Sequence, residues 1–295
     1  MKVWVVGGAG YIGSHVCKAL KEAGHEAVVF DNLSTGSRDN LLPGCTLQVG
    51  DILDREALKA AASEHRFDAV VHLAALKAAG ESMLDPVTYS RHNITGSLNL
   101  LEAVLEAGIP SLVFSSTAAV YGAPRYLPLD EKHPTQPENY YGHTKRAIEE
   151  FLAWYGQLKG LKHVSLRYFN AAGYDPAGEV RGLERNPANL LPIVMETAMG
   201  WRQGMQVFGD DYDTPDGTCL RDYIHVTDLA SAHVAALEHL HRGGGNLAVN
   251  LGTGAGVSVL EMIRRAREIT GREIPATIAP RRAGDPAVVI AAADE

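Results

Sequence analysis

The chain has 295 residues, of which 46% are hydrophobic and 21% are charged, so it is long enough for about two domains with a substantial core. These values exclude a small disulfide-stapled protein, a wholly disordered chain and a coiled coil. Lys and Arg number 27 against 35 Asp and Glu, and the formal net charge of −8 disfavours nonspecific binding to nucleic acid or anionic membranes. An anionic ligand would need a local group of Arg side chains or a helix N-terminus.

Cysteine usage favours a reducing, cytoplasmic environment. The cysteines are Cys17, Cys45 and Cys219, an odd number without C-x-x-C spacing, so neither a disulfide framework nor a zinc site is indicated. The first apolar run passes directly into a glycine-rich turn, and no apolar run reaches about 18 residues. We therefore expect no signal peptide and no membrane span.

The first half of the sequence alternates short β-branched runs with amphipathic stretches, which predicts an α/β fold with a doubly wound parallel sheet of the Rossmann type. The expected strands cover residues 2–6, 26–30, 45–49, 68–73, 111–115 and 163–168. The expected helices cover residues 11–23, 54–65, 93–107 and 141–158. Gly24, Gly108 and Gly160 follow three of these helices as C-terminal stops.

After about residue 169 the alternation weakens, and Pro and Gly become denser. We expect a first domain over residues 1–168 and a smaller mixed α/β substrate domain over residues 169–295. A helix at 226–240 and a strand at 246–251 make residues 222–251 a candidate segment for return to the first domain. Ser258 with Glu261 forms a capping-box pattern that opens a last helix, which Gly271 ends.

A glycine-rich segment, VGGAGYIG at residues 6–13, joins the first strand to the first helix. Dinucleotide binding needs glycine there, because the turn requires positive φ and the pyrophosphate must approach bare backbone at a helix N-terminus. Asp31 closes the second strand, where a carboxylate accepts hydrogen bonds from a ribose 2′-OH and repels a 2′-phosphate. The segment therefore predicts NAD in preference to NADP. A P-loop is excluded because no Gly-Lys-Ser/Thr follows; the remaining alternative is a turn that only packs a helix.

The segment YGHTK places Tyr141 and Lys145 four residues apart, on one helical face. With 11 Tyr, about a third of random chains of this composition would contain such a pair, and Lys145 could instead be a surface partner of Glu149. A third element strengthens the catalytic interpretation: Thr117 follows the fifth strand, at the sheet edge where ligands bind in such folds. These three residues are the candidate catalytic group.

The chemistry of this group is the oxidation of a secondary alcohol. A tyrosine hydroxyl has a pKa near 10, so to act as a base at neutral pH its phenolate must be stabilised, by about 1.4 kcal/mol for each unit by which the pKa is lowered. A nearby ammonium and a cationic nicotinamide both lower that pKa. Tyr141 would take the proton as hydride leaves for the nicotinamide, and the Thr117 hydroxyl would hold the substrate oxygen in line.

Two possible metal sites are rejected. His233, His239 and His241 lack a facing set of carboxylates or cysteines, so we expect them to face solvent. The acidic loop at residues 210–217 invites a calcium interpretation, but Pro215 stands where an EF-hand needs a ligand. No metal is predicted.

From Val3 to about Ala291 the chain resembles the extended short-chain dehydrogenase/reductases, and within them the nucleotide-sugar enzymes. The more specific segments are DNLSTG at 31–36, LKAAGES at 76–82, SSTAAVYG at 115–122, LRYFN at 166–170 and residues 211–228 with DGTCLRDYIHV. Departures are Val6 and Thr117, where members usually carry Thr and Ser, and Ala119, which is Thr in some. The resemblance also implies a further helical tail after the last residues.

The resemblance implies an isomerase that interconverts UDP-glucose and UDP-galactose through a 4-keto intermediate while NAD stays bound. It implies a cofactor site that we list as follows: Gly7, Gly10, Tyr11, Ile12, Gly13, Asp31, Asn32, Asp51, Ile52, Leu73, Ala74, Lys77, Asn93 and Tyr168. The implied UDP-hexose site comprises Thr117, Tyr141, Asn170, Asn189, Leu190, Val207, Phe208, Arg221, Arg282, Asp285 and Val289. It further implies a homodimer joined by the helices near 93–107 and 141–158.

Several alternatives remain open at this level. Arg221 and Arg282 would supply positive charge for a diphosphate, or each would pair with an acidic neighbour such as Asp222 or Asp285. A nucleotide-sugar 4,6-dehydratase would need an Asp-Glu pair beside the catalytic hydroxyl, where this chain has two alanines. A catalytically silent NAD-binding regulator would not need the catalytic group at all. A modest side chain at Val289 is compatible with N-acetylated hexoses.

Overall fold

The computed structural model describes residues 1–182, 184, 187, 189–282 and 284–292. Its largest layer is a seven-stranded sheet in the order β10-β6-β5-β4-β1-β2-β3, with every neighbouring pair parallel. The strands are β1 (Lys2–Val6), β2 (Glu26–Asp31), β3 (Thr46–Val49), β4 (Ala69–His72), β5 (Ser111–Ser115), β6 (Lys162–Tyr168) and β10 (Leu247–Leu251). The predicted doubly wound parallel sheet is confirmed.

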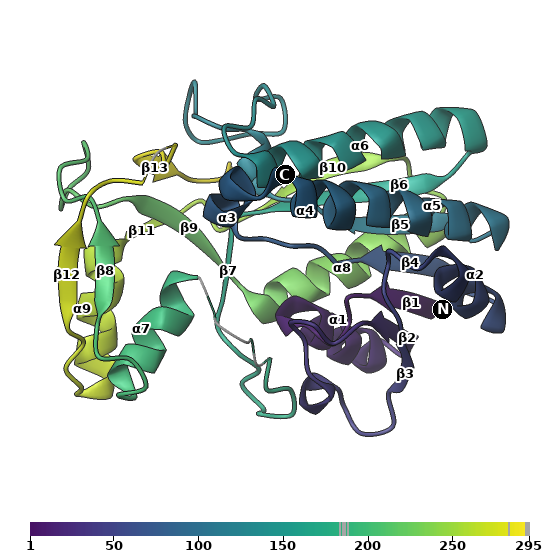
Figure 1. Ribbon diagram of the computed structural model, residues 1–295, viewed down its shortest axis with the longest axis horizontal. Coiled ribbons are helices and arrows are strands. Elements are labelled where there is room, and N and C mark those ends of the chain that lie inside the picture. The colour runs from purple at the N-terminus through teal and green to yellow at the C-terminus, as the bar shows by residue number, and fades with distance from the viewer. Residues whose placement is uncertain (183, 185–186, 188, 283, 293–295) are drawn as a thin grey trace.

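Helices cover both faces of this sheet (Figure 1). One face carries α2 (Arg55–Glu64), α5 (Gly96–Glu106) and α6 (Tyr140–Lys159), whose Leu58, Leu100 and Leu152 are fully buried against β1, β4 and β5. The other face carries α1 (Tyr11–Glu22) and α8 (Val226–His241). Burying β-branched strand residues on both faces is what makes the strands nearly continuous apolar runs in the sequence.

The connection between β4 and α5 differs from the prediction of one helix over 93–107. It contains α3 (Ala79–Leu84), α4 (Pro86–Tyr89) and a π-helical turn over Ser90–Thr95, which leads directly into α5. The side chain of Asn93, inside that turn, hydrogen-bonds both the backbone of Leu76 and the hydroxyl of Thr144. Single π-helical turns inside α-helices are frequent at functional sites.

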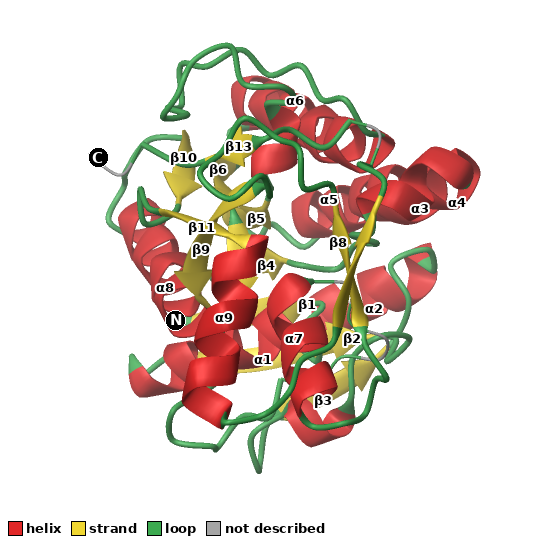
Figure 2. Cartoon of the chain, turned by 90° about the vertical axis from the view of Figure 1, so that its left-hand side faces the viewer, coloured by secondary structure: helices red, strands yellow, loops and turns green. Residues whose placement is uncertain are grey.

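The remaining strands form two small sheets at one end of the molecule (Figure 1), the end that faces the viewer in Figure 2. The first contains β7 (Asn170–Ala172), β9 (Leu220–His225), β11 (Gly256–Ser258) and β13 (Val288–Val289). The second pairs β8 (Met205–Phe208) with β12 (Ala276–Ala279), and α7 (Leu190–Ala198) and α9 (Val259–Thr270) share a hydrophobic core with it. The Ser258 cap of α9 and its stop at Gly271 (φ 63°) are as predicted.

The chain returns to the large sheet after β9. Helix α8 packs beside α1, and β10 pairs with β6 from Leu247 opposite Val164 to Leu251 opposite Tyr168. The short helical turns Arg38–Asn40 and Ala118–Val120 complete the secondary structure of the described chain. Within that part of the chain, no helix is long and apolar enough to cross a membrane.

The expectation that His233 faces solvent is wrong. Its side chain is fully buried, and Nδ1 lies 2.8 Å from the carbonyl oxygen of Leu229. The cause is the position of α8, which packs against β5 and β6 of the sheet and beside α1, and therefore buries a wide face. Burial lowers the pKa of His233 to about 4, so the ring is neutral at physiological pH.

Candidate active site

The glycine turn between β1 and α1 is closely packed against the ends of neighbouring strands. Gly7 has φ 88°, and a Cβ atom there would lie 2.5 Å from the backbone nitrogen of Ala74. A Cβ at Gly13 would lie 2.3 Å from the Gly7 carbonyl oxygen. Helix α1 starts at Tyr11 with Gly10 as its N-cap, so no side chain covers its first-turn N–H groups. This bare backbone at a helix N-terminus fits the pyrophosphate of a dinucleotide.

Asp31 lies at the end of β2, beside the glycine turn. Its carboxylate accepts hydrogen bonds from the backbone N–H of Ala9 (2.9 Å) and of Leu33 (2.8 Å). Burial raises the pKa of Asp31, and these two hydrogen bonds oppose that shift. The next residue, Asn32, donates to the carboxylate of Asp51 at 2.8 Å. The predicted ribose-binding carboxylate is therefore held in place by the turn that would bind the pyrophosphate.

The loop after β4 contains further predicted cofactor residues. The backbone N–H groups of Leu73 and Ala74 donate to the Val6 carbonyl at 2.8 and 3.0 Å. Asn93 accepts from Leu76 N at 2.9 Å and donates to Thr144 Oγ1 at 3.0 Å, so it joins this loop to α6. The ammonium of Lys77 contacts the carboxylate of Glu184. Ile52 is buried against Gly96 at the start of α5.

The structure brings the three candidate catalytic residues together. The Thr117 hydroxyl lies close enough to the Tyr141 phenol to lower its pKa. The Lys145 ammonium donates to the Ser115 carbonyl at 2.8 Å and lies 6.0 Å from the centre of the Tyr141 ring. Asn139 caps α6 by accepting from Gly142 N at 2.8 Å, which fixes the start of the helix that carries both residues.

Burial controls the protonation of this group. It raises the pKa of the Tyr141 phenol, and the hydrogen bond from Thr117 opposes that shift. Burial lowers the pKa of Lys145 to about 7, and the negative charge of Glu149 opposes that shift. Because the phenol resists ionisation, a nearby positive charge is needed before it can act as a base near neutral pH.

A buried polar network behind Lys145 escaped the sequence analysis. Glu149 accepts from Ser116 Oγ at 2.5 Å and from Arg167 Nη2 at 2.6 Å, and Arg167 Nη1 donates to the Tyr121 hydroxyl at 3.1 Å. The interpretation of Lys145 as a surface partner of Glu149 is therefore wrong, because the lysine is only 3% exposed and Glu149 pairs with Arg167. In the sequence, the four-residue spacing of Lys145 and Glu149 was the one pattern that pointed to this buried network.

Tyr168, at the end of β6, closes the group from the opposite side. Its hydroxyl contacts the hydroxyl of Ser115, the residue whose carbonyl accepts from Lys145. Burial raises the pKa of Tyr168 to about 12, so it remains a neutral phenol. The backbone N–H of Tyr141 donates to Ser82 Oγ at 2.9 Å, a contact from α3 that no sequence pattern indicated.

Five of the eleven predicted sugar-nucleotide residues lie on strands of the two small sheets: Asn170, Val207, Phe208, Arg221 and Val289. The Arg221 guanidinium contacts the Asp285 carboxylate, one of the two acidic partners considered from the sequence. The Arg282 guanidinium lies 3.8 Å from the centre of the Phe208 ring. Asn189 is the N-cap of α7, which begins at Leu190, and Asn170 begins β7. Val207 is 1% exposed and belongs to the core between β8, α7 and α9, whereas Val289 packs against a cluster that contains Ala118 and Phe169.

The sequence model of the NAD dependent epimerase/dehydratase family matches residues 3–252, and the chain belongs to this family. It is 50% identical over 99% of its length to a UDP-glucose 4-epimerase of Azospirillum brasilense, of which it covers 84%. The structure of UDP-glucose 4-epimerase from Brucella ovis in complex with NAD superposes with a TM-score of 0.95 at 47% identity, covering 99% of this chain and 89% of that one. The UDP-Glc/GlcNAc 4-epimerase of Campylobacter jejuni superposes with a TM-score of 0.84 at 40% identity, covering 99% and 91%.

The pKa of Lys145 has a measurable consequence for stability. Its folded value of about 7 lies below its ordinary value of 10.5, so between these pH values the unfolded chain binds more protons at this residue than the folded chain. The free energy of unfolding therefore rises with pH in this window, by at most about 1.4 kcal/mol per pH unit from this group. In Lys145→Met that contribution disappears, and urea titrations at pH 7, 8 and 9 should show a shallower rise.

Lys159→Met is the matched control, because Lys159 is exposed at the other end of the same helix. This variant should keep the slope of the wild-type protein. An equal slope in Lys145→Met and wild-type protein would contradict the assignment of a lowered pKa to Lys145.

Proposed function

We propose that this chain is an NAD-dependent isomerase, a 4-epimerase that interconverts UDP-glucose and UDP-galactose through a 4-keto intermediate. The observation that carries the proposal is the group of Tyr141, Thr117 and buried Lys145 at the carboxyl edge of a dinucleotide-type sheet. Membership of the NAD dependent epimerase/dehydratase family and the similarity to named UDP-glucose 4-epimerases over nearly the whole chain support it.

Each catalytic residue has one task in this proposal. Tyr141 removes the proton of the sugar 4′-hydroxyl and later returns it, because its phenol lies beside the Thr117 hydroxyl, whereas the Lys145 ammonium is held by the Ser115 carbonyl. The hydroxyl of Thr117 holds the same sugar oxygen in line. Lys145 supplies the positive charge that offsets the effect of burial on the phenol. The glycine turn and Asp31 would hold NAD, which would supply a reversible hydride acceptor for C4, so that the net redox change would be zero.

The chain would divide this work between two parts. We assign cofactor binding to residues 1–168 with the returning segment 222–251, and UDP-hexose binding to the remainder of residues 169–295. Arg221 and Arg282 would meet the diphosphate, for which the net charge of −8 requires local positive charge. Tight binding of the UDP group would let the 4-keto sugar rotate in the site without leaving it.

The structure gives less support to the two alternatives, a nucleotide-sugar 4,6-dehydratase and a catalytically silent NAD-binding protein. The elimination step of a 4,6-dehydratase needs an acid-base pair beside the catalytic hydroxyl, and here the short helical turn Ala118–Val120 follows Thr117. A silent NAD-binding protein has no use for a buried lysine and a hydroxyl aimed at the same phenol. Burying an ammonium is unfavourable, so its retention favours a catalytic role.

The function is tested by incubating purified protein with UDP-galactose and no added cofactor, and measuring UDP-glucose by anion-exchange chromatography. Tyr141→Phe removes the proton acceptor and should lower turnover by about 10²- to 10⁴-fold while leaving the fold and bound NAD intact. Tyr140→Phe is the matched control, because its hydroxyl bonds Ser90 Oγ at 2.6 Å outside the catalytic group. Near-normal turnover in Tyr141→Phe would refute the mechanism, and no product from the wild-type protein would refute the function.

The proposal extends to UDP-N-acetylhexosamines. Val289 lies on β13 opposite Arg221 of β9, and its side chain is only half-buried. Val289→Phe should reduce turnover of UDP-N-acetylglucosamine at least about ten-fold more than that of UDP-glucose, because the acetyl group needs the space that a ring would fill. Val288→Phe, whose side chain points to the opposite face of the strand, should not discriminate. Absence of any wild-type activity on the acetylated sugar would overturn this extension.

We also propose a homodimer formed through α5 and α6. Both helices belong to one core cluster, and α6 exposes Trp154 (59%) and Leu158 (71%) on its outer face. Light scattering should give twice the chain mass, and Trp154→Glu should give a monomer because a charge cannot be buried unpaired at the interface. Trp201→Glu, at a residue 74% exposed on the other end of the molecule, is the control and should remain dimeric. A monomeric wild-type protein would refute the dimer.

A further inference from the structure

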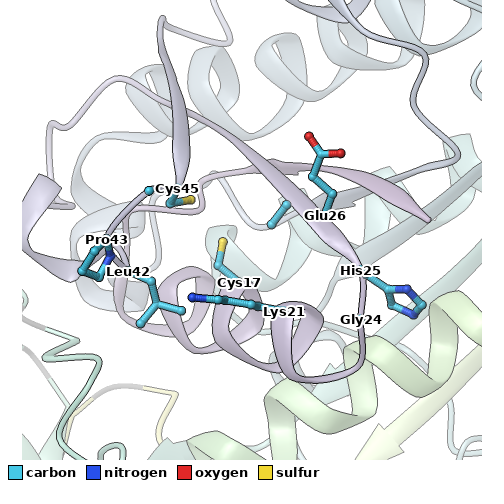
Figure 3. Close-up of a pocket in the computed structure, with 10 residues that line it drawn as sticks. Cys17, Lys21, Gly24, His25, Glu26, Leu42, Pro43 and Cys45 are labelled. Atoms are coloured by element: carbon cyan, nitrogen blue, oxygen red, sulfur yellow. The ribbon is translucent and has the colours of Figure 1, made fainter.

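Two cysteines that the catalytic mechanism does not use face each other across a pocket. Cys17 lies in α1, and Cys45 is the residue before β3. Both belong to the hydrophobic cluster on the α1 face of the sheet, and Figure 3 shows their side chains between the helix and the strands. Both side chains line the same pocket, and their sulfur atoms point toward one another (Figure 3).

The pocket gives one of these thiols access to small molecules. Its volume is about 420 Å³, and Cys17, Cys45, Lys21, Leu42 and Pro43 are among the residues that line it. Cys45 is half-buried, whereas Cys17 is only 3% exposed. A pocket of this size accepts a small organic molecule, and Cys45 is the sulfur that such a molecule would reach first.

The surroundings also make the two thiols chemically unequal. The neighbouring Cys17 thiol and the positive charge of Lys21 lower the pKa of Cys45, whereas the neighbouring Cys45 sulfur and burial raise the pKa of Cys17. Cys17 thus remains a thiol, and its Sγ donates to the carbonyl oxygen of Gly8. An accessible thiol with a lowered pKa and an adjacent second thiol is the arrangement of reactive cysteine pairs, and in reducing compartments such pairs form disulfides that are transient.

We propose that this pocket is a thiol-modification site for low-molecular-weight disulfides, in which Cys45 is the attacking sulfur and Cys17 resolves the adduct. In the first step the Cys45 thiolate bonds to one sulfur of the reagent, the reagent disulfide breaks, and one thiolate leaves and takes up a proton. In the second step Cys17 loses its proton to solvent and attacks Cys45, and a second thiol leaves. The two cysteines are oxidised to one intrachain disulfide while the reagent is reduced to two thiols.

The new bond would connect the nucleotide-binding helix to the third strand. Cys17 Sγ lies 4.0 Å from the carbonyl oxygen of Gly8 in the glycine turn, so the sulfur that changes partner touches the backbone of that turn. The third cysteine, Cys219, is buried elsewhere in the fold and does not line this pocket. It therefore serves as an internal control for reaction at Cys45.

The test treats the native protein with oxidised glutathione at pH 7 without oxygen, quenches with an alkylating agent in denaturant, and measures intact mass and linked peptides. The wild-type protein should lose about 2 Da and yield one peptide pair joined through Cys17 and Cys45. Cys17→Ser should instead accumulate one glutathione adduct, of about 305 Da, on Cys45. Cys219→Ser should behave as the wild-type protein, and none of these readouts depends on enzymatic activity.

Two further variants separate chemistry from loss of structure. Cys45→Ser should form either product at least about ten-fold more slowly than the wild-type protein reacts, although Cys17 remains present. Lys21→Met should slow the first step at pH 7, with the pH midpoint of alkylation of Cys45 moved upward. Circular dichroism checks the fold of each variant, and Cys17→Ala replaces Cys17→Ser if the serine disturbs the core.

Three results would overturn the proposal. The first is an adduct that appears on Cys219 as fast as on Cys45. The second is a Cys45 that reacts no faster in the native protein than in urea. The third is a Cys17→Ser variant that carries no adduct on Cys45 after the wild-type protein has reacted.

Discussion

The buried ammonium of Lys145 is the constraint on which the rest of the active site depends. A charged amine removed from water is unfavourable unless hydrogen bonds and nearby charge compensate it. Here the Ser115 carbonyl accepts a hydrogen bond from the ammonium at 2.8 Å, and Glu149 lies one helical turn away. Glu149 is itself held by Arg167, so its charge is shared between two cations. The pKa of Lys145 consequently lies at about 7. The position of its ammonium is fixed by the end of β5 and by helix α6.

The sequence predicted the first half of the fold well because its signals are local. The strands β1 and β5 have the predicted bounds, β2, β3 and β6 differ by one residue at one end, and β4 is shorter by one residue at each end. The small sheets could not be predicted, since strands such as β7 (Asn170–Ala172) and β13 (Val288–Val289) are too short for a period to show. Their partner, β9, is distant in sequence from both, and tertiary packing selects the pairing.

The same distinction applies to the candidate site. Tyr141, Lys145 and Thr117 could be predicted because two share a helical face and the third follows a strand whose end lies at the ligand-binding edge. Glu149 with Arg167, Asn93 with Leu76, and Ser82 with Tyr141 could not, because each contact joins elements far apart along the chain. The mistaken expectation for His233 has the same origin: polarity indicated solvent, but the packing of α8 decided burial.

The connection between the two parts of the chain matters for the proposed reaction. Strand β9 carries Arg221 among the sugar-nucleotide candidates and then continues without a loop into α8, which packs against the glycine-turn helix. The fully buried carboxylate of Asp222, next to Arg221, accepts from Thr253 N at 2.8 Å, Gly254 N at 3.0 Å and Ala291 N at 3.2 Å. These bonds fix β9 to segments on both sides. A diphosphate held at β9 would therefore keep a set distance from Tyr141, so that the only large movement left to a bound intermediate is rotation of the sugar itself.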